Sequence, residues 1–405
     1  NNCFVDWLSD TTNISIAAFC PEDNNLPTVE SIRYQFYNRK QIEVETYTDN
    51  SPTGKLVDDK SITRVSKVKK EQKGKFGSTV WTLSNGARII LKPTDLKENQ
   101  IRLTVISPGG TSLYDDSEIK NLELMSSIAT LGGYGDYNKI QLRKLLSGKS
   151  TNVVPTVATL REGIIGYTTP KDFETMMQLV YLQFTSPRKD SIAYNSFMNR
   201  YRTQLEGKEK DPSTNLSDTL LVAMYNHHPR AISLKPDDLN KIDYDRSMKI
   251  FKERFSDVSD FTFYLVGDFK PDSIKPVIEK YIGALPASQS NEKYVDRKKY
   301  IRKGNYGNNF TRKMETPKST VVAILHAPEK ANLKNEIKMD MLTQILRMIY
   351  TEEIREKEGG TYGVSVKGVV VRIRKQLANI QISFTTNPER RDRLTKLVLD
   401  LYTTF

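Results

Sequence analysis

Hydrophobic and polar residues alternate along most of the chain with two periods, one typical of β-strands and the other typical of amphipathic helices. A period of two predicts strands at 81–93, 100–107, about 150–160, 162–169 and 261–266. Helical spacing predicts helices at 118–131, 140–146, 170–185, 190–208, 213–226, 243–255 and 272–282. We therefore expect an α+β unit, with a mostly antiparallel, meandering sheet and helices packed on one face.

The helix after residue 170 shows this pattern most clearly. Pro170 begins it, as proline does at the first turn of many helices. One face of this helix carries Phe173, Met176, Met177 and Val180. These four side chains are expected in the core.

Segments about 218 residues apart resemble each other, which indicates an internal duplication. The matching pairs are 118–120 with 336–338, 179–180 with 397–398, Thr168 with Thr385, and the proline-ended strands 106–108 with 326–328. The offsets are 218, 218, 217 and 220. In the second copy we expect a strand at 319–326 and helices at about 335–356 and 388–402.

The duplication predicts how the chain is divided. Residues 1–44 are expected to be the tail of a preceding repeat, and residues 45–75 a linker between halves. Residues 76–290 are expected to form a complete repeat, and residues 291–405 a second repeat truncated at its C-terminus. The tail is expected to hold a strand at 14–19 and a helix from Pro27 to about 44. The chain thus resembles a window from a longer polypeptide.

Composition suits a folded protein, since 38% of the residues are hydrophobic and 27% are charged. No apolar run reaches the roughly 20 residues that a membrane span requires. The net charge of +12 invites a nucleic-acid interpretation, but the basic segments 67–75 and 296–313 carry no nucleic-acid motif. We interpret both segments as solvated linker or edge-strand charge, and a nucleic-acid partner is the least favoured alternative.

The chain has two cysteines, Cys3 and Cys20, which are too few for a disulfide framework or a cysteine zinc site. The pair could form one disulfide or remain as two free thiols, and the sequence leaves both alternatives open.

Five longer segments resemble the pitrilysin/insulinase family of zinc metallopeptidases. They are LSNGARIILKPT at 83–94, SPGGTSLYDD at 107–116, the segment 167–190, FTFYLVGDF at 261–269 and IREKEGGTYGVSV at 354–366. Members of this family carry four repeats in two halves, which close around a chamber. The resemblance implies that this chain is the C-terminal half, which lacks the zinc site.

The family binds zinc through an inverted His-x-x-Glu-His motif on the first helix of its first repeat. The matching helices of this chain carry Glu123, Ser126 and Ser127 in one repeat, and Met341, Gln344 and Ile345 in the other. Serine hydroxyls are poor zinc ligands, and one carboxylate alone cannot build the site. We therefore expect no metal site here, no catalytic residue in this fragment, and zinc in the missing N-terminal half.

The three histidines are interpreted as surface or hydrogen-bonded side chains. His227 and His228 are adjacent in a loop, and neighbouring side chains rarely chelate one ion from an extended segment. His326 ends an apolar strand.

Arg355 and Tyr362 are the candidate substrate-binding residues. Arg355 falls in the last turn of the helix at 335–356, Gly359 and Gly360 end that helix, and Tyr362 begins the next strand. Both side chains can donate hydrogen bonds to a peptide carbonyl. The alternative is an arginine that complements a helix C-terminus and a tyrosine that fills a strand position. The resemblance favours the substrate role, because the family has an Arg and a Tyr seven positions apart here.

The resemblance implies the substrate-binding, chamber-closing half of a zinc endopeptidase that cleaves peptides or unfolded segments. Its expected partners are the N-terminal half of the same polypeptide and a peptide substrate, in the periplasm or cell envelope of a bacterium. The alternative is a non-proteolytic binding or scaffold protein of the same fold. A zinc motif in the missing upstream part would decide between them.

Overall fold

The computed structural model describes residues 15–18, 26–38, 52, 54–359, 361, 363–372 and 376–404, and the chain divides into two units, 1–51 and 52–405. In the first unit, helix α2 (Val29–Asn38) lies within the predicted helix, and residues 15–18 have no regular secondary structure. Cys3 and Cys20 lie outside the described residues, so their pairing stays open.

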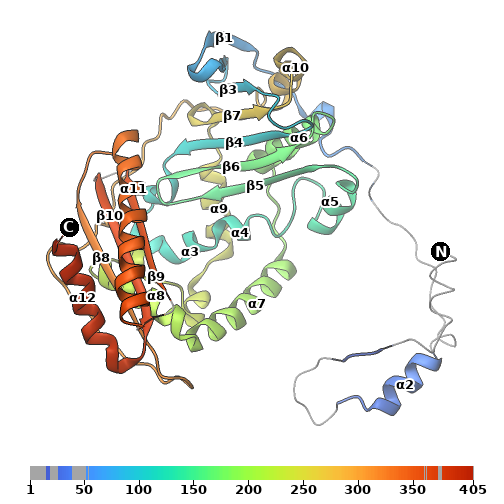
Figure 1. Cartoon of the computed structure of the whole chain (residues 1–405). Coiled ribbons are helices and arrows are strands. Elements are labelled where there is room, and N and C mark those ends of the chain that lie inside the picture. Colours follow the sequence, from blue (N-terminus) through green and yellow to red (C-terminus); the bar gives the residue numbers. More distant parts are fainter. Residues whose placement is uncertain are drawn as a thin grey trace. The chain divides into compact units, whose positions relative to one another are not determined.

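The second unit contains a seven-stranded sheet with the strand order β1-β2-β3-β7-β4-β6-β5 (Figure 1). Its strands are β1 (Val68–Lys73), β2 (Thr79–Leu83), β3 (Arg88–Pro93), β4 (Ile101–Pro108), β5 (Thr151–Val157), β6 (Arg161–Thr168) and β7 (Thr262–Gly267). Every pairing is antiparallel except that of β3 with β7. The predicted mostly antiparallel sheet is confirmed.

Helices follow these strands at nearly all of the predicted positions. They are α3 (Ile119–Glu123), α4 (Met125–Ile128), α5 (Lys139–Leu145), α6 (Phe173–Thr185), α7 (Ser191–Lys210), α8 (Pro212–Met224), α9 (Tyr244–Arg254) and α10 (Pro271–Tyr281). In β4 the odd-numbered side chains are buried and most even-numbered ones are exposed, so one face of the sheet meets the core. Across the described residues, every helix is too short or too polar to cross a bilayer.

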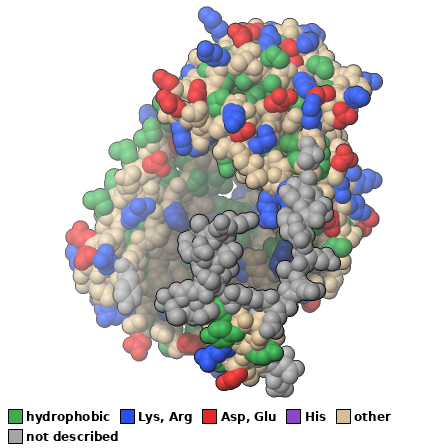
Figure 2. All heavy atoms as spheres, turned by 90° about the vertical axis from the view of Figure 1, so that its right-hand side faces the viewer, with side chains coloured by type: hydrophobic (Ala, Val, Ile, Leu, Met, Phe, Trp, Pro, Cys, Tyr) green, Lys and Arg blue, Asp and Glu red, His purple; other side chains and the backbone are tan. Residues whose placement is uncertain are grey.

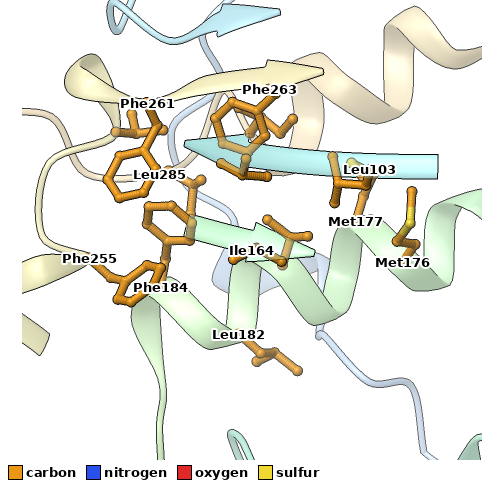
Figure 3. Close-up of a cluster of buried hydrophobic side chains, with 14 of the residues drawn as sticks. Leu103, Ile164, Met176, Met177, Leu182, Phe184, Phe255, Phe261, Phe263 and Leu285 are labelled. Carbon is orange, nitrogen blue, oxygen red and sulfur yellow. The ribbon is translucent and has the colours of Figure 1, made fainter. Parts of the chain in front are cut away.

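Apolar side chains of α6 and of the central strands form the core (Figure 3). The predicted face of α6 is buried as expected, and each of Phe173, Met176, Met177 and Val180 is at most 3% exposed. Phe184, near the end of α6, meets Phe261 edge-on with 4.9 Å between ring centroids. This packing against the sheet stabilises α6 more than its intrinsic helix propensity does.

Two predicted elements are each divided in the structure. The predicted strand 81–93 is the hairpin β2–β3, which turns at Gly86 with a φ of 93°. The predicted helix 118–131 breaks at Leu124, whose backbone is not helical, into α3 and α4. A continuous helix turns about 100° per residue, which would place Leu122 and Leu124 on different faces. The break allows both side chains to be buried.

A three-stranded antiparallel sheet with the order β8-β10-β9 forms the last part of the second unit. Its elements are β8 (Ser319–Pro328), α11 (Leu333–Tyr350), a π-helix (Thr351–Lys357), β9 (Val364–Val371), β10 (Leu377–Thr386), a 3₁₀ turn (Pro388–Arg390) and α12 (Arg391–Thr404). A separate apolar cluster lies among these elements, and it includes Tyr350, Ile354, Phe384, Leu394 and Val398. Each sheet therefore has its own core.

The strand register supports the duplication. Adding 218 to both members of every β4–β6 pair gives a β8–β10 pair, so that Ile101 opposite Thr168 corresponds to Ser319 opposite Thr386. The match of Thr168 with Thr385 was wrong by one residue. Thr168 and Thr386 are both buried, whereas Thr385 is exposed, and a shift of one residue moves a side chain to the other face.

The helices that follow these strands agree with the same offset. Met176 and Val180 of α6 correspond to Leu394 and Val398 of α12, and all four side chains are at most 2% exposed. The domain boundaries at 76–290 and 291–405 stay a prediction.

The basic segment 68–73 forms β1 at the edge of the sheet. Of the two interpretations of this segment, solvated linker charge and edge-strand charge, the structure shows the edge strand.

Candidate functional site

The helix positions that correspond to the family's zinc ligands lie on both sides of the break between α3 and α4. Glu123 is the last residue of α3, and Ser126 and Ser127 belong to α4. Glu123 lines a pocket of about 260 Å³ together with Tyr201 and other residues. Partial exclusion of water raises the pKa of the Glu123 carboxyl above its usual range. One carboxylate beside two serines on a broken helix does not fit a zinc ion.

The corresponding positions of the second sheet lie on α11. Met341 and Ile345 are both more than half exposed, and neither of these side chains has the nitrogen, oxygen or thiolate donor that zinc prefers. Among the described residues, no group of three His, Cys, Asp or Glu side chains is arranged to hold a metal ion.

The histidines make the hydrogen bonds expected of structural side chains. His228 Nδ1 accepts from the Arg230 N–H at 3.1 Å, so its Nε2 carries the proton and donates to the Arg297 carbonyl at 2.8 Å. His326 Nε2 lies 2.8 Å from the Arg302 carbonyl oxygen. His227 is exposed. The interpretation as surface or hydrogen-bonded histidines is confirmed.

Arg355 lies in the π-helix that continues α11, rather than in the last turn of an α-helix. The preceding residue, Ile354, is fully buried, and it packs this segment against the core of the second sheet. The Arg355 side chain is 54% exposed, and its Nε lies 3.5 Å from Glu356 of the same segment. An exposed guanidinium on a packed segment can donate hydrogen bonds to an approaching carbonyl. Single-turn π-helices frequently occur at functional sites.

The corner after the π-helix turns at Gly359, which has a φ of 55°. Tyr362 and Gly360 lie outside the described residues, so the pairing of Arg355 with Tyr362 stays a prediction. Their neighbour Thr361 donates a hydrogen bond through its Oγ1 to the Thr385 carbonyl, at 2.7 Å. The corner is thus attached to the end of β10.

A buried ionic cluster, which the sequence did not predict, lies at the turn after β4. The Gly110 N–H donates to Glu162 Oε2 at 2.5 Å, and Arg254 Nη1 lies 3.7 Å from Glu162 Oε1. Arg254 also makes two hydrogen bonds to Glu292, at 2.7 and 3.1 Å. Burial raises the pKa of Glu162 to about 7, because the charged carboxylate is only 1% exposed. This cluster attaches the segment after α10 to the first sheet.

Charge is mixed on the face shown in Figure 2, where Lys and Arg side chains are interspersed with Asp and Glu. No single basic patch gathers there among the described residues. Nucleic-acid binding relies on clustered positive charge along a face, and the described residues in this view show mixed charge instead.

Comparisons with known proteins identify relatives of this chain. Residues 241–402 match the family model described as the peptidase M16 inactive domain. A probable zinc protease PqqL of Haemophilus influenzae is 20% identical over 315 residues, which are 78% of this chain and 33% of that protein. The chain spans about a third or less of the length of the curated relatives it matches.

Solved structures share the fold. The periplasmic protease PqqL from Escherichia coli superposes with a TM-score of 0.76 at 19% identity, over 93% of this chain and 41% of that one. Pitrilysin superposes with a TM-score of 0.57 at 11% identity, over 83% of this chain and 36% of that one. The predicted α+β fold and the predicted resemblance are confirmed. The chain is therefore similar to the pitrilysin/insulinase, or M16, family of zinc metallopeptidases, and its residues 241–402 match the inactive domain of that family.

Proposed function

We propose that this chain is the substrate-binding half, itself without zinc, of a zinc metalloendopeptidase that cleaves peptides or unfolded segments. Two observations carry this proposal. Residues 241–402 match an inactive domain, and the positions corresponding to the zinc ligands hold Glu123, Ser126 and Ser127. The zinc and the groups that activate water would then belong to the N-terminal half of the same polypeptide.

The role of this half is to enclose the substrate and to donate hydrogen bonds to it. The planar guanidinium of Arg355 can donate hydrogen bonds to a peptide carbonyl. Tyr362 supplies a phenol O–H seven residues later. Both donors would favour an oxygen that gains negative charge during attack, so they would act mainly on the transition state.

The periplasm or cell envelope is the proposed location, supported by the E. coli relative described as periplasmic. The proposed partners are the N-terminal half and a peptide substrate.

The experiment that tests this proposal is turnover of a quenched peptide by the complete polypeptide, with and without a chelator. We expect hydrolysis that the chelator abolishes and that added zinc restores. Binding of the same peptide without any hydrolysis would instead support the non-proteolytic scaffold of this fold, and would overturn the proposal.

A further inference from the structure

The first sheet has one open face, formed by the outward side chains of the adjacent strands β5, β6, β4, β7 and β3. Inward side chains of these strands, such as Leu103 and Ile164, belong to the same buried core as α6 and α10, so both helices lie on the other face (Figure 1). Along β4 the outward positions are Arg102, Thr104 and Ile106. The open face therefore carries both apolar and polar groups.

Apolar side chains gather on the open face in rows that cross the sheet. Ile165 pairs with Val154 on one side and with Thr104 on the other. Thr104 pairs in turn with Tyr264. The most exposed apolar side chains, each between 37% and 57% exposed, are Val154, Ile165, Tyr167, Tyr264 and Val266. A contiguous exposed apolar patch of this kind marks an interaction surface.

Every charged side chain at the outward positions of these strands is basic. These side chains are Arg88, Lys92, Arg102 and Arg161. Among the described residues, none of the four forms an ion pair with a carboxylate, and Arg102 donates to the neutral Gln100 side chain at 3.4 Å. Charge complementarity therefore favours an acidic partner.

Three other occupants fit the open face less well. A second copy of the chain would bring two basic faces together, and like charges repel. A permanent partner would favour an interface as apolar as a core, whereas Arg102 and Thr104 lie in the middle of this face. Single-stranded nucleic acid stacks its bases on aromatic rings, and aliphatic side chains such as Ile165 offer no ring.

We propose that the open face binds a transient partner, an extended polypeptide segment that combines acidic and apolar side chains. This inference rests on the proposed function, for which it names the class of substrate. Every second side chain of an extended segment points to the same side. Such a segment can place apolar groups on Ile165 and Tyr264, and a carboxylate on the Arg102 guanidinium, which suits a bidentate pair.

Fluorescence anisotropy of short labelled peptides with the 405-residue chain tests this inference. In the first peptide every second residue is Ser, and the residues between them alternate Glu with Ile or Phe. A second peptide has Lys in place of Glu, and a third has Ser in place of Ile and Phe. We expect the first peptide to bind at least about tenfold more tightly than either of the others.

Variants of the chain locate the binding surface. Arg102→Glu should weaken binding of the first peptide by about tenfold and strengthen binding of the Lys peptide. Tyr264→Thr should also weaken binding, because it removes an aromatic contact and keeps a residue that suits a strand. Arg200→Glu is the matched control, since Arg200 is exposed on α7 and the change in net charge is the same. We expect it to bind as the parent does.

Equal affinity for the Glu and Lys peptides, or parent-like binding by Arg102→Glu, would overturn this inference. Tighter binding of a single-stranded oligonucleotide that displaces the peptide, with a steep salt dependence, would also overturn it. Peptide hydrolysis by the complete polypeptide tests the proposed function separately. Cleavage of the first peptide with the same KM in parent and Arg102→Glu would overturn the inference alone. Binding at the open face without any hydrolysis would overturn the proposed function, and the segment would then be a ligand rather than a substrate.

Discussion

Replacing Tyr362 by phenylalanine in the complete enzyme is expected to lower kcat by about 100-fold, without lowering the melting temperature. The change removes one hydrogen-bond donor and keeps the ring, and loss of a donor to a developing oxyanion typically costs a factor of about 10² to 10³. The measurement is kcat and KM for a quenched peptide, together with a thermal melt.

Two further variants make this result specific. Arg355→Lys keeps the positive charge but loses the planar, forked geometry, so turnover should also fall. Lys357→Ala serves as the control, because Lys357 lies in the same π-helix and pairs with Glu352 and Glu353. Unchanged turnover with a lowered melting temperature for Tyr362→Phe would show that the tyrosine fills a structural position.

Replacing Glu162 by glutamine is expected to increase the stability of the protein relative to the parent, and this gain should be larger at pH 8 than at pH 5. The pKa of Glu162 is raised to about 7 in the folded protein, from 4.5 without the fold. The folded state therefore binds more protons between these values, and the free energy of unfolding falls as the pH rises through this window. A pKa shift of this size corresponds to a loss of about 3 kcal/mol of unfolding free energy in the parent protein as the pH rises. Glutamine does not titrate, so the variant should not show this loss.

Urea denaturation of the parent and the Glu162→Gln variant at pH 5 and pH 8 measures this effect. The amide oxygen of glutamine can still accept from Gly110, so the turn after β4 should be kept. The difference in unfolding free energy between the two proteins should grow with pH. A difference that is the same at both pH values would contradict the burial argument.

The periodicity of hydrophobic residues and the constant offset between repeated segments were sufficient to predict much of the fold. The apolar face of residues 170–185 identified α6, because helical periodicity reports directly on which side is buried. Offsets near 218 indicated the duplication, and the strand register supports it. The match at Thr168 was off by one residue, because two adjacent threonines near the end of β10 are indistinguishable in sequence and lie on opposite faces.

The features that were missed depend on tertiary contacts. The break at Leu124 follows from packing of α3 and α4 against the core, which overrides helix propensity. The cluster of Glu162, Arg254 and Glu292 joins three segments far apart in sequence, and no local pattern marks it. The sequence predicted Arg355 near the end of a helix but did not predict that this end is a π-helix. So short a segment has no distinct periodicity in the sequence.

The contact between Glu358 and Arg393 was missed for the same reason. Glu358 and Arg393 are 35 residues apart, and only the return of the chain through β10 brings them together. The candidate donors came from a family resemblance, whereas the contacts of Glu358 and Thr361 required the folded chain.

Metal analysis and peptide turnover of the purified 405-residue chain test the central claim most directly. Neither helix that corresponds to the zinc-binding helix carries a usable ligand set among its described residues. The account therefore predicts zinc well below one ion per chain and no hydrolysis of a quenched peptide. One tightly held zinc ion per chain, with hydrolysis that a chelator abolishes, would contradict it.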